Sequence, residues 1–329
     1  MFKKDIEKRI FSIENELQFE QLALEIFQVQ AEHNKIYKEF IKNLKINVTD
    51  VKSLQQIPFL PIEFFKTQEV VTGNFTAEAI FKSSGTTGLE TSSHYVKDLS
   101  LYEKSFITNF KSALGSPEDF TFLALLPSYL ERNDSSLIYM TKKLIEQSND
   151  DRSGFYLNAT TELIQLLQQL NSENKKHILL GVTFALLDFP NESSHDFSKT
   201  MIMETGGMKG RKKEMIREEV HAELKNKFGV KTIYSEYGMT ELLSQAYSKT
   251  DGNYSTPPWM KVFIREPNDP FEILSLTHAG AINIIDLANI YSCSFIATDD
   301  LGRINADGSF SVSGRMDSSD VRGCNLLVV

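Results

Sequence analysis

The residues best suited to chemistry in this sequence begin with a run of small side chains directly after the apolar pair Ile80-Phe81. The run consists of Ser83, Ser84, Gly85, Thr86, Thr87 and Gly88. Because Gly is flexible and Ser and Thr hydroxyls compete with backbone hydrogen bonds, the run favours a loop. The amides and hydroxyls of such a loop can wrap a polyphosphate. Taken alone, the run is equally well interpreted as a Ser/Thr loop without a ligand.

Three further segments carry adjacent glycines, carboxylates or a Tyr-Gly pair. In chain order they are ETGGMKG (204–210), SEYGMTE (235–241) and ATDDLGRINADGSFSVSGRMD (297–317), followed by RGCN. The first run is not the common P-loop, because GxxxxGK[ST] does not occur around it and no lysine follows Gly88. The six histidines show no HExxH spacing, and the two cysteines, Cys293 and Cys324, allow neither a CxxC pattern nor a disulfide framework.

The elements that must position these segments alternate between buried strands and helices. Strands are predicted in FTFLALLPS, KHILLGVTFALLDF, KTMIMETGG and VKTIYSEYGMTE, with helices in SSLIYMTKKLIEQ, TELIQLLQQLN and RKKEMIREEVHAELKNKFG. This alternation predicts an α/β fold with βαβ units and a largely parallel sheet. Ligands of such sheets bind beyond the C-terminal ends of the strands. We therefore expect the ligand at the loops after AIF, MIME and KTIYS.

The composition and the expected secondary structure divide the chain into four regions. Residues 1–57 contain no Gly or Pro, and Leu22, Ile26 and Val29 share one helical face, which predicts a helical N-terminal segment packed on the main body. Residues 58–252 are expected to form the α/β core that binds the ligand. Residues 253–317, with short strand-like pieces between turns, predict a smaller barrel-like β subdomain, and residues 318–329 form a short C-terminal tail.

Composition excludes several classes of protein. Apolar residues make up 41% of the 329 residues and charged residues 24%, as in a globular protein with a core. The net charge of −9 argues against general nucleic-acid binding, so an anionic ligand must be held by local donors. The sequence contains neither a signal-peptide core nor an apolar run of membrane-spanning length. We expect a soluble, cytoplasmic protein.

The ordered set of segments resembles the adenylate-forming superfamily of acyl-CoA synthetases, nonribosomal adenylation domains and luciferases. That family has a Ser/Thr/Gly phosphate loop, a YGxTE motif, a TGD motif and a GRxD hinge, and the resemblance covers about residues 80–325. It implies the large N-terminal-type domain of these enzymes. LPSYLERNDSSLIYM, TGGMKGR and SDVRGCNLLVV look like the acyl-protein synthetase branch. This branch comprises the fatty-acid-activating subunit of bacterial bioluminescence reductase systems and its non-luminous relatives.

The resemblance implies roles for residues around the phosphates and the adenine of ATP. The loop from Ser83 to Gly88 would hold the β- and γ-phosphates. Gly206 and Gly207 would let the adenine approach the backbone closely. Tyr237 would stack on the adenine, with Gly238 beside it. A core position for Tyr237 is the alternative interpretation.

The resemblance also implies roles at the reacting phosphate and the ribose. Thr240 would touch the α-phosphate, and Glu241 would act as a catalytic residue and hold Mg²⁺. Asp300 would bind both ribose hydroxyls and Arg315 would also reach the ribose, while Asp317 takes the hinge position. As alternatives, Glu241 is a surface carboxylate, Asp300 is a turn former, and Arg315 pairs with a nearby aspartate on a wet surface.

The sequence departs from the family pattern in three places. Asp299 replaces the Gly of the TGD motif. The sequence ends at Val329, so we expect the C-terminal lid domain, with its catalytic lysine, to be absent. The phosphate loop also lacks its trailing lysine. Candidate substitutes for these missing charges are Lys82, Lys209 and Arg211, for each of which solvated surface charge is the alternative.

Cys324 lies seven residues beyond Asp317. In the acyl-protein synthetase branch the activated acyl group passes to a cysteine near the C-terminus, and Cys324 matches that position. A thiolate is a good nucleophile toward an acyl-phosphate anhydride, and Arg322 nearby would lower its pKa. The alternative is a small buried residue in a final strand. Cys293, within IYSCSFIA, is expected in the core.

These observations lead to one main hypothesis and two alternatives. The protein would use ATP and Mg²⁺ to convert a carboxylic acid, in particular a fatty acid, to an acyl-adenylate. It would then carry the acyl group on Cys324 and pass it to an acyl-CoA reductase or another acyl carrier or acceptor protein. In the first alternative the acceptor is CoA or a carrier-protein thiol. In the second, the protein is a catalytically degenerate nucleotide-binding subunit.

Overall fold

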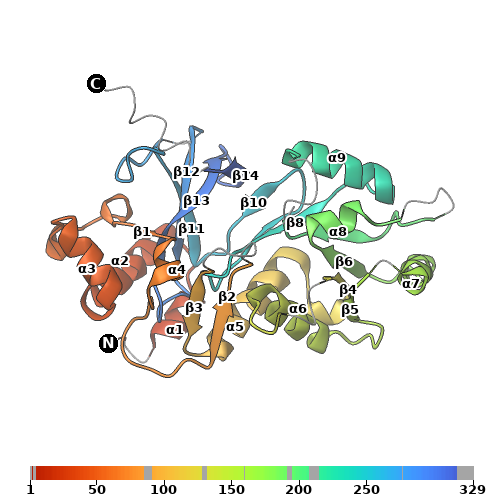
Figure 1. The fold of residues 1–329 in the computed structure, drawn as a ribbon, viewed down its shortest axis with the longest axis horizontal. Helices are drawn as coiled ribbons and strands as arrows, with labels where there is room; N and C mark the ends of the chain where they lie inside the picture. Colours follow the sequence, from red (N-terminus) through yellow and green to blue (C-terminus); the bar gives the residue numbers. More distant parts are fainter. Residues whose placement is uncertain are drawn as a thin grey trace.

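The computed structural model describes residues 2, 5–84, 91–127, 132–158, 160–190, 195–206, 215–275 and 277–316. Part of its main sheet is parallel and alternates with helices, as the sequence predicts (Figure 1). The strands of this part, in the order β5-β4-β6-β7-β8, are β4 (Thr121–Leu125), β5 (Gly154–Tyr156), β6 (His177–Gly181), β7 (Met201–Glu204) and β8 (Tyr234–Tyr237). The helices between them are α6 (Ser136–Gln147), α7 (Thr161–Ser172), α8 (Thr183–Leu187) and α9 (Arg217–Phe228).

Helices cover both faces of this parallel part, which explains its apolar strands. Successive side chains of a strand point to opposite faces. Leu123 and Leu125 pack in one buried cluster with residues of α7, α8 and α9, whereas Phe122 and Ala124 pack in the other with residues of α5 (Leu99–Leu114) and α6. Every residue of β4 and β6 is buried, as expected of strands covered on both sides.

The strands after β8 are antiparallel and continue the same sheet. They are β9 (Ala246–Ser248), β10 (Asn253–Ser255), β11 (Met260–Arg265), β12 (Ala279–Asp286), β13 (Phe295–Ile304) and β14 (Phe310–Arg315). In space their order is β11-β12-β13-β14-β10-β9-β8, and β1 (Leu60–Pro61) pairs in parallel with β13. Among the described residues hydrogen bonding thus runs without a break from the parallel part into the β-rich region expected at 253–317, and the division of the chain there stays a prediction.

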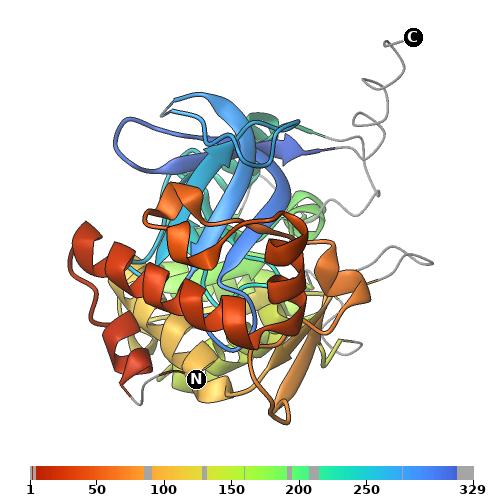
Figure 2. The same cartoon turned by 90° about the vertical axis from the view of Figure 1, so that its left-hand side faces the viewer.

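The N-terminal residues form the expected helices, α1 (Ile6–Ile10), α2 (Glu16–His33) and α3 (Lys35–Asn43). Figure 2 shows them lying across the antiparallel strands. Gln30, fully buried in α2, donates to the carbonyls of Asn289 and Ile290 and accepts from the amide of Ser294. Phe27 meets Phe295 of β13 edge-on, with ring centroids 6.0 Å apart. This segment therefore shares one core with the strands it covers.

A separate hairpin carries the Ser/Thr/Gly run. It consists of β2 (Ala79–Lys82) and β3 (Ser93–Val96), which pair only with each other. The strand before the run thus lies outside the parallel sheet, consistent with the exposed side chains at two of its four positions. The remaining elements are α4 (Phe64–Thr67) and the 3₁₀ helices η1 (Val48–Asp50), η2 (Leu54–Gln56) and η3 (Pro117–Asp119). In the described part of the chain no helix combines the length and apolarity needed to cross a membrane.

Candidate functional site

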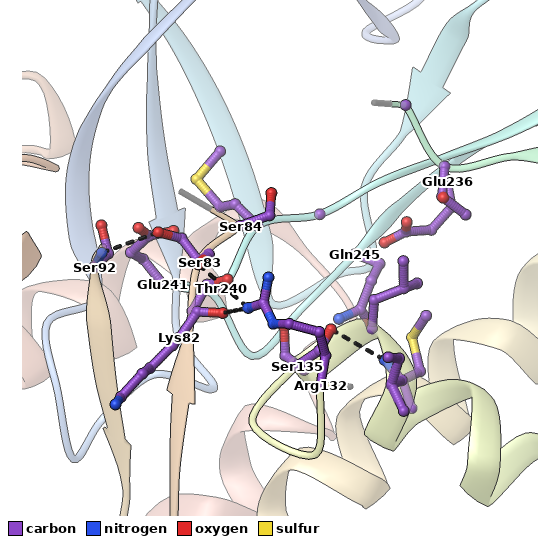
Figure 3. Close-up of a pocket in the computed structure, with 18 of the residues that line it drawn as sticks. Lys82, Ser83, Ser84, Ser92, Arg132, Ser135, Glu236, Thr240, Glu241 and Gln245 are labelled. Atoms are coloured by element: carbon purple, nitrogen blue, oxygen red, sulfur yellow. Dashed lines mark hydrogen bonds between the residues drawn. The ribbon is translucent and has the colours of Figure 1, made fainter. Parts of the chain in front are cut away.

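A cavity of about 970 Å³ opens where the C-terminal ends of the parallel strands meet the β2–β3 hairpin (Figure 3). The segments that follow strands β6, β7 and β8 supply residues within two positions of the strand ends, including Val182, Gly206 and Gly238. The hairpin supplies Ser83, and β14 supplies Arg315. The cavity therefore lies where ligands bind in parallel sheets.

The base of the Ser/Thr/Gly run is fixed by hydrogen bonds across the hairpin. The amide of Ser92 donates to Oγ of Ser83 at 2.9 Å, and the amide of Ser83 donates to the carbonyl of Ser92 at 3.1 Å. Ser83 and Ser84 both line the cavity. The other four expected phosphate-loop residues lie outside the described residues, namely Gly85, Thr86, Thr87 and Gly88.

Arg132 is a cavity residue that the sequence motifs did not identify. Its guanidinium donates to the carbonyls of Lys82 and Ser83 at 2.7 and 3.2 Å, and to Oδ1 of Asp134 at 3.1 Å. Arg132 thus places positive charge directly against the start of the loop. A signal was available, since Arg132 follows strand β4, at the strand end where ligands are expected.

The cationic substitutes nominated from the sequence are placed less favourably. Lys82 contributes to the cavity wall, but Figure 3 shows its amine directed away from Ser83 and Arg132. Lys209 and Arg211 lie outside the described residues. Among the described residues, Arg132 is therefore a stronger candidate than Lys82 to meet a phosphate.

Gly206 forms a turn that a buried carboxylate holds. Its φ of +75° is in the left-handed region that favours glycine. Oε2 of Glu204 accepts from the amide of Gly206 at 2.9 Å and from the hydroxyl of Thr183 at 2.8 Å, and Oε1 accepts from Arg217 at 2.7 Å. Burial by itself would raise the pKa of Glu204, but hydrogen bonding with His221 and these partners lowers it to about 2. Gly207, its predicted companion, lies outside the described residues.

Asp300 connects the predicted adenine and ribose residues. Tyr237 donates its hydroxyl to Oδ2 of Asp300 at 2.8 Å, and Nε of Arg315 donates to Oδ1 at 3.2 Å. Arg315 lines the cavity, whereas the ring of Tyr237 is buried against Tyr254 and Phe310, with centroids 5.6 and 5.4 Å away. Tyr237 thus holds Asp300, and its stacking on adenine stays a prediction.

Thr240 and Glu241 line the same cavity. Glu241 is buried, and Ser92 donates a hydrogen bond to its carboxylate. Burial raises the pKa of Glu241 and outweighs the opposing effect of Ser92. A carboxylate that is costly to ionise gains from a bound cation, so Glu241 fits the expected magnesium ligand.

The backbone of Thr240 and Glu241 is held by two residues that the sequence did not identify. Nδ1 of His94 donates to the Thr240 carbonyl at 2.8 Å, and Nε2 lies 2.9 Å from Oδ1 of Asn289. The Asn289 amide donates to the Glu241 carbonyl at 2.8 Å and to the Cys293 carbonyl at 3.0 Å. Burial outweighs the two contacts of His94 and lowers its pKa to about 4. Neither residue belongs to a sequence motif that could have revealed it.

Asp299, which stands where the resemblance expects Gly, also lines the cavity. Burial first, then the hydrogen bond and charge of Glu63, raise the pKa of Asp299 to about 6. Arg315 and Lys66 oppose this shift. The cavity wall therefore carries, in Asp299, a carboxyl group that keeps its proton to a higher pH than usual.

The two cysteines differ in what the structure describes. Cys293 is fully buried, as predicted, and burial raises its pKa to about 12. Its thiol donates to the carbonyl of Phe295. A buried thiol with a high pKa is a poor nucleophile. Cys324 and the hinge residue Asp317 lie outside the described residues.

Known proteins resemble this chain in structure rather than in sequence. No family model matches the sequence, and no curated protein matches it. ATP-bound MatB from Rhodopseudomonas palustris matches with a TM-score of 0.53 and 17% identity, over 72% of this chain and 48% of MatB. An open conformation of 2-hydroxyisobutyryl-CoA ligase, in complex with 2-HIB-AMP and CoA, matches with a TM-score of 0.65 and 11% identity, over 92% of this chain and 71% of the ligase.

A luciferase-like enzyme from the nonluminescent mealworm Zophobas morio matches with a TM-score of 0.50 and 16% identity, over 77% of this chain and 61% of the enzyme. These neighbours are adenylate-forming enzymes, and the chain spans about half the length of MatB. The expected fold class is confirmed: the described residues have the mixed α/β fold, with a large parallel-rich sheet, of the N-terminal domain of adenylate-forming enzymes.

Proposed function

We propose that this protein, which has the fold of an adenylate-forming N-terminal domain, uses ATP to activate a carboxylic acid as an acyl-adenylate. One observation carries the proposal. Residues from four separate motifs, represented by Ser83, Gly206, Thr240 and Arg315, border a single cavity at the strand ends. Motifs that are spread over more than two hundred residues thus border one cavity, as expected if they serve one ligand.

The reaction needs groups that bring two anions together. The substrate carboxylate attacks the α-phosphorus of ATP, the bond to the bridging oxygen breaks, and pyrophosphate leaves with the electron pair. Arg132 and Arg315 border the cavity and offset this charge. Thr240, held by His94, would position the α-phosphate, and holding both reactants in one orientation lowers the barrier further.

Magnesium is the cofactor that the residues of the cavity fit. Glu241 would hold the ion through its buried carboxylate, which Ser92 orients. A bound magnesium ion would supply charge neutralisation at the phosphates. Ser83 and Ser84 would bind phosphate oxygens from the facing hairpin.

For the second half of the reaction we propose transfer to the enzyme itself. The Cys324 thiolate would attack the acyl carbonyl, AMP would leave, and a thioester would form. The acyl group, that of a fatty acid, would then pass to an acyl-CoA reductase or another acceptor protein. Apolar cavity residues such as Leu126, Ile138 and Met140 would hold the chain. Transfer to CoA is the competing route, favoured by the CoA bound to the similar 2-hydroxyisobutyryl-CoA ligase.

The test combines ATP–pyrophosphate exchange with intact-mass measurement after incubation with ATP, Mg²⁺ and a panel of carboxylic acids. We expect exchange with at least one acid and a hydroxylamine-labile mass increment equal to its acyl group. Cys324→Ser should keep the exchange and lose the increment. Cys293→Ala is the matched control and should keep both.

Each alternative has its own signature in this test. Exchange that requires Cys324, or an acyl group found on another residue, would contradict the assignment of that cysteine. Labelled acyl groups that migrate with CoA would select the ligase route. ATP binding without exchange for any acid would select the degenerate nucleotide-binding subunit and refute the proposal.

A further inference from the structure

One side of the cavity is formed by two buried polar side chains, Glu236 and Gln245. Figure 3 shows them on the side away from Ser83 and Ser84. Glu236 is 7% exposed and Gln245 is 4% exposed. Both lie over Gly238, because a Cβ on that glycine would stand 2.4 Å from Oε1 of Glu236 and 3.3 Å from Cγ of Gln245.

The hydrogen bonding of this Glu236–Gln245 pair is incomplete. Oε1 of Gln245 is buried without a partner. Within the described residues, no group hydrogen-bonds to the Glu236 carboxyl. Buried polar groups in folded proteins are rarely left this way, because an unmade hydrogen bond in the interior costs free energy. A ligand that enters the cavity can supply what the protein does not.

The surroundings of Glu236 define which ligand group is missing. Among the described residues no basic side chain pairs with Glu236, and the charge that affects its pKa is the carboxylate of Glu204. Burial, followed by Glu204, raises the pKa of Glu236 to about 8. The other titratable groups close enough to interact are Tyr102, Tyr247 and Tyr254.

Tyr102 already donates its hydroxyl to the carbonyl of Ser136 at 3.2 Å. The Glu236 carboxyl and the amide oxygen of Gln245 thus stand in the cavity wall without a hydrogen bond from another described residue. An unsubstituted hydrocarbon chain would cover both and satisfy neither.

We propose that the acid activated at this site carries a hydroxyl or amino group on its chain, and that the Glu236–Gln245 pair binds this group. The inference rests on the proposed adenylation and narrows its substrate from any fatty acid to one with a hydrogen-bond donor. The neighbouring apolar wall, including Leu126, Met140 and Val182, would hold the hydrocarbon part. Glu236 and Gln245 are thus specificity residues that contact the substrate.

A hydroxyl and an ammonium group would differ in their dependence on pH. A hydroxyl pairs with either form of Glu236, so its binding should change little between pH 6 and 8. An ammonium group pairs best with the ionised carboxylate, so its binding releases the proton of Glu236 and strengthens as the pH rises toward 8. The slope should approach tenfold per pH unit.

The experiment compares straight-chain acids that carry hydrogen, hydroxyl or ammonium at the same carbon, with that carbon varied along the chain. Two readouts are taken on the full chain: kcat/KM in ATP–pyrophosphate exchange and the shift of the thermal unfolding midpoint on binding. We expect one hydroxy or amino acid to exceed its unsubstituted parent by on the order of 100-fold in kcat/KM. Glu236→Met should abolish or reverse this preference, and Glu236→Gln should weaken it for the ammonium acid more than for the hydroxy acid.

Met140→Leu is the matched control, because it alters the apolar wall of the same cavity without a change in hydrogen bonding. It should keep the preference for the donor. A wild-type preference for the unsubstituted acid at every position, or a donor preference that survives Glu236→Met, would overturn the inference. If no acid supports exchange, the proposed adenylation is refuted. The shifts of the unfolding midpoint then test the binding inference separately: a larger shift for the hydroxy or amino acid that is lost in Glu236→Met supports it, and no such difference overturns it.

Discussion

At the scale of single residues, the exposed side chain of Arg315 allows its effect on ATP binding to be measured without a large change in protein stability. Its side chain is 67% exposed and lies 3.2 Å from Asp300, so the pair contributes about 1 kcal/mol or less to folding. Arg315→Ala should raise KM for ATP by roughly tenfold, the effect of about 1.4 kcal/mol of lost binding, with the unfolding midpoint almost unchanged. Arg303→Ala, an exposed arginine on β13, is the control and should change neither quantity. Equal KM values for both variants would remove Arg315 from the site.

The sequence predicted several of the residues that border the cavity, but not the residues that hold them in place. Thr240, Glu241 and Arg315 belong to motifs whose types and order are readable along the chain. His94 and Asn289 are 146 and 48 residues away from the carbonyls that they contact. Such a contact follows from the packing of distant segments and leaves no local pattern, so it could not be predicted.

At the scale of elements, the turn after β7 depends on a left-handed glycine. Gly206 has φ +75° and Gly73 has φ +83°, and a Cβ on either would meet nothing within 4 Å. Gly206→Ala and Gly73→Ala should therefore cost a similar 1–3 kcal/mol, about the strain of a non-Gly residue in this region. Only Gly206→Ala should also raise KM for ATP, because Gly73 lies away from the cavity. Denaturant titration and exchange kinetics check the two effects, and a KM increase in both variants would show that strain alone is responsible.

The elements differ in how well the sequence predicted them. The apolar runs of β4 and β6 and the amphipathic pattern of α7 were sufficient, because strands buried on both faces and amphipathic helices leave clear signals. The signal for α9 was instead Gly229, the left-handed glycine that ends the helix. The β2–β3 hairpin was not predicted as a separate sheet. Its two strands have four residues each, and such short segments do not indicate their pairing partner.

At the scale of the whole molecule, a buried carboxyl sets a pH dependence of stability. Burial raises the pKa of Glu236 to about 8 in the folded protein, whereas the ordinary pKa of a glutamate is 4.5. Unfolding therefore releases a proton between these values, and the contribution of Glu236 to the unfolding free energy falls as the pH rises through this window. Glu204 acts in the opposite sense, because its pKa of about 2 gives stability above pH 4.5 that is lost on acidification.

Glu236→Gln should remove this pH dependence, because glutamine does not ionise. The unfolding free energy of the variant minus that of the wild-type protein should therefore increase from pH 5 to pH 8. Denaturant titrations at several pH values, without added acid, measure this difference. Glutamine and glutamate have nearly the same size, so the packing of the two proteins is comparable. A difference that stays constant over the range would mean that Glu236 ionises normally in the folded state.

The buried amide of Gln30 on α2 has a consequence for the behaviour of the entire fold. It hydrogen-bonds to the backbone of Asn289 and Ser294, and the side chain of Asn289 in turn donates to the carbonyl of Glu241. Helix α2 thus stabilises, through Asn289, the backbone position of Glu241, which lies more than two hundred residues downstream. A shortened protein that begins after residue 57 would lose this support, so we expect it to weaken the magnesium binding proposed for Glu241.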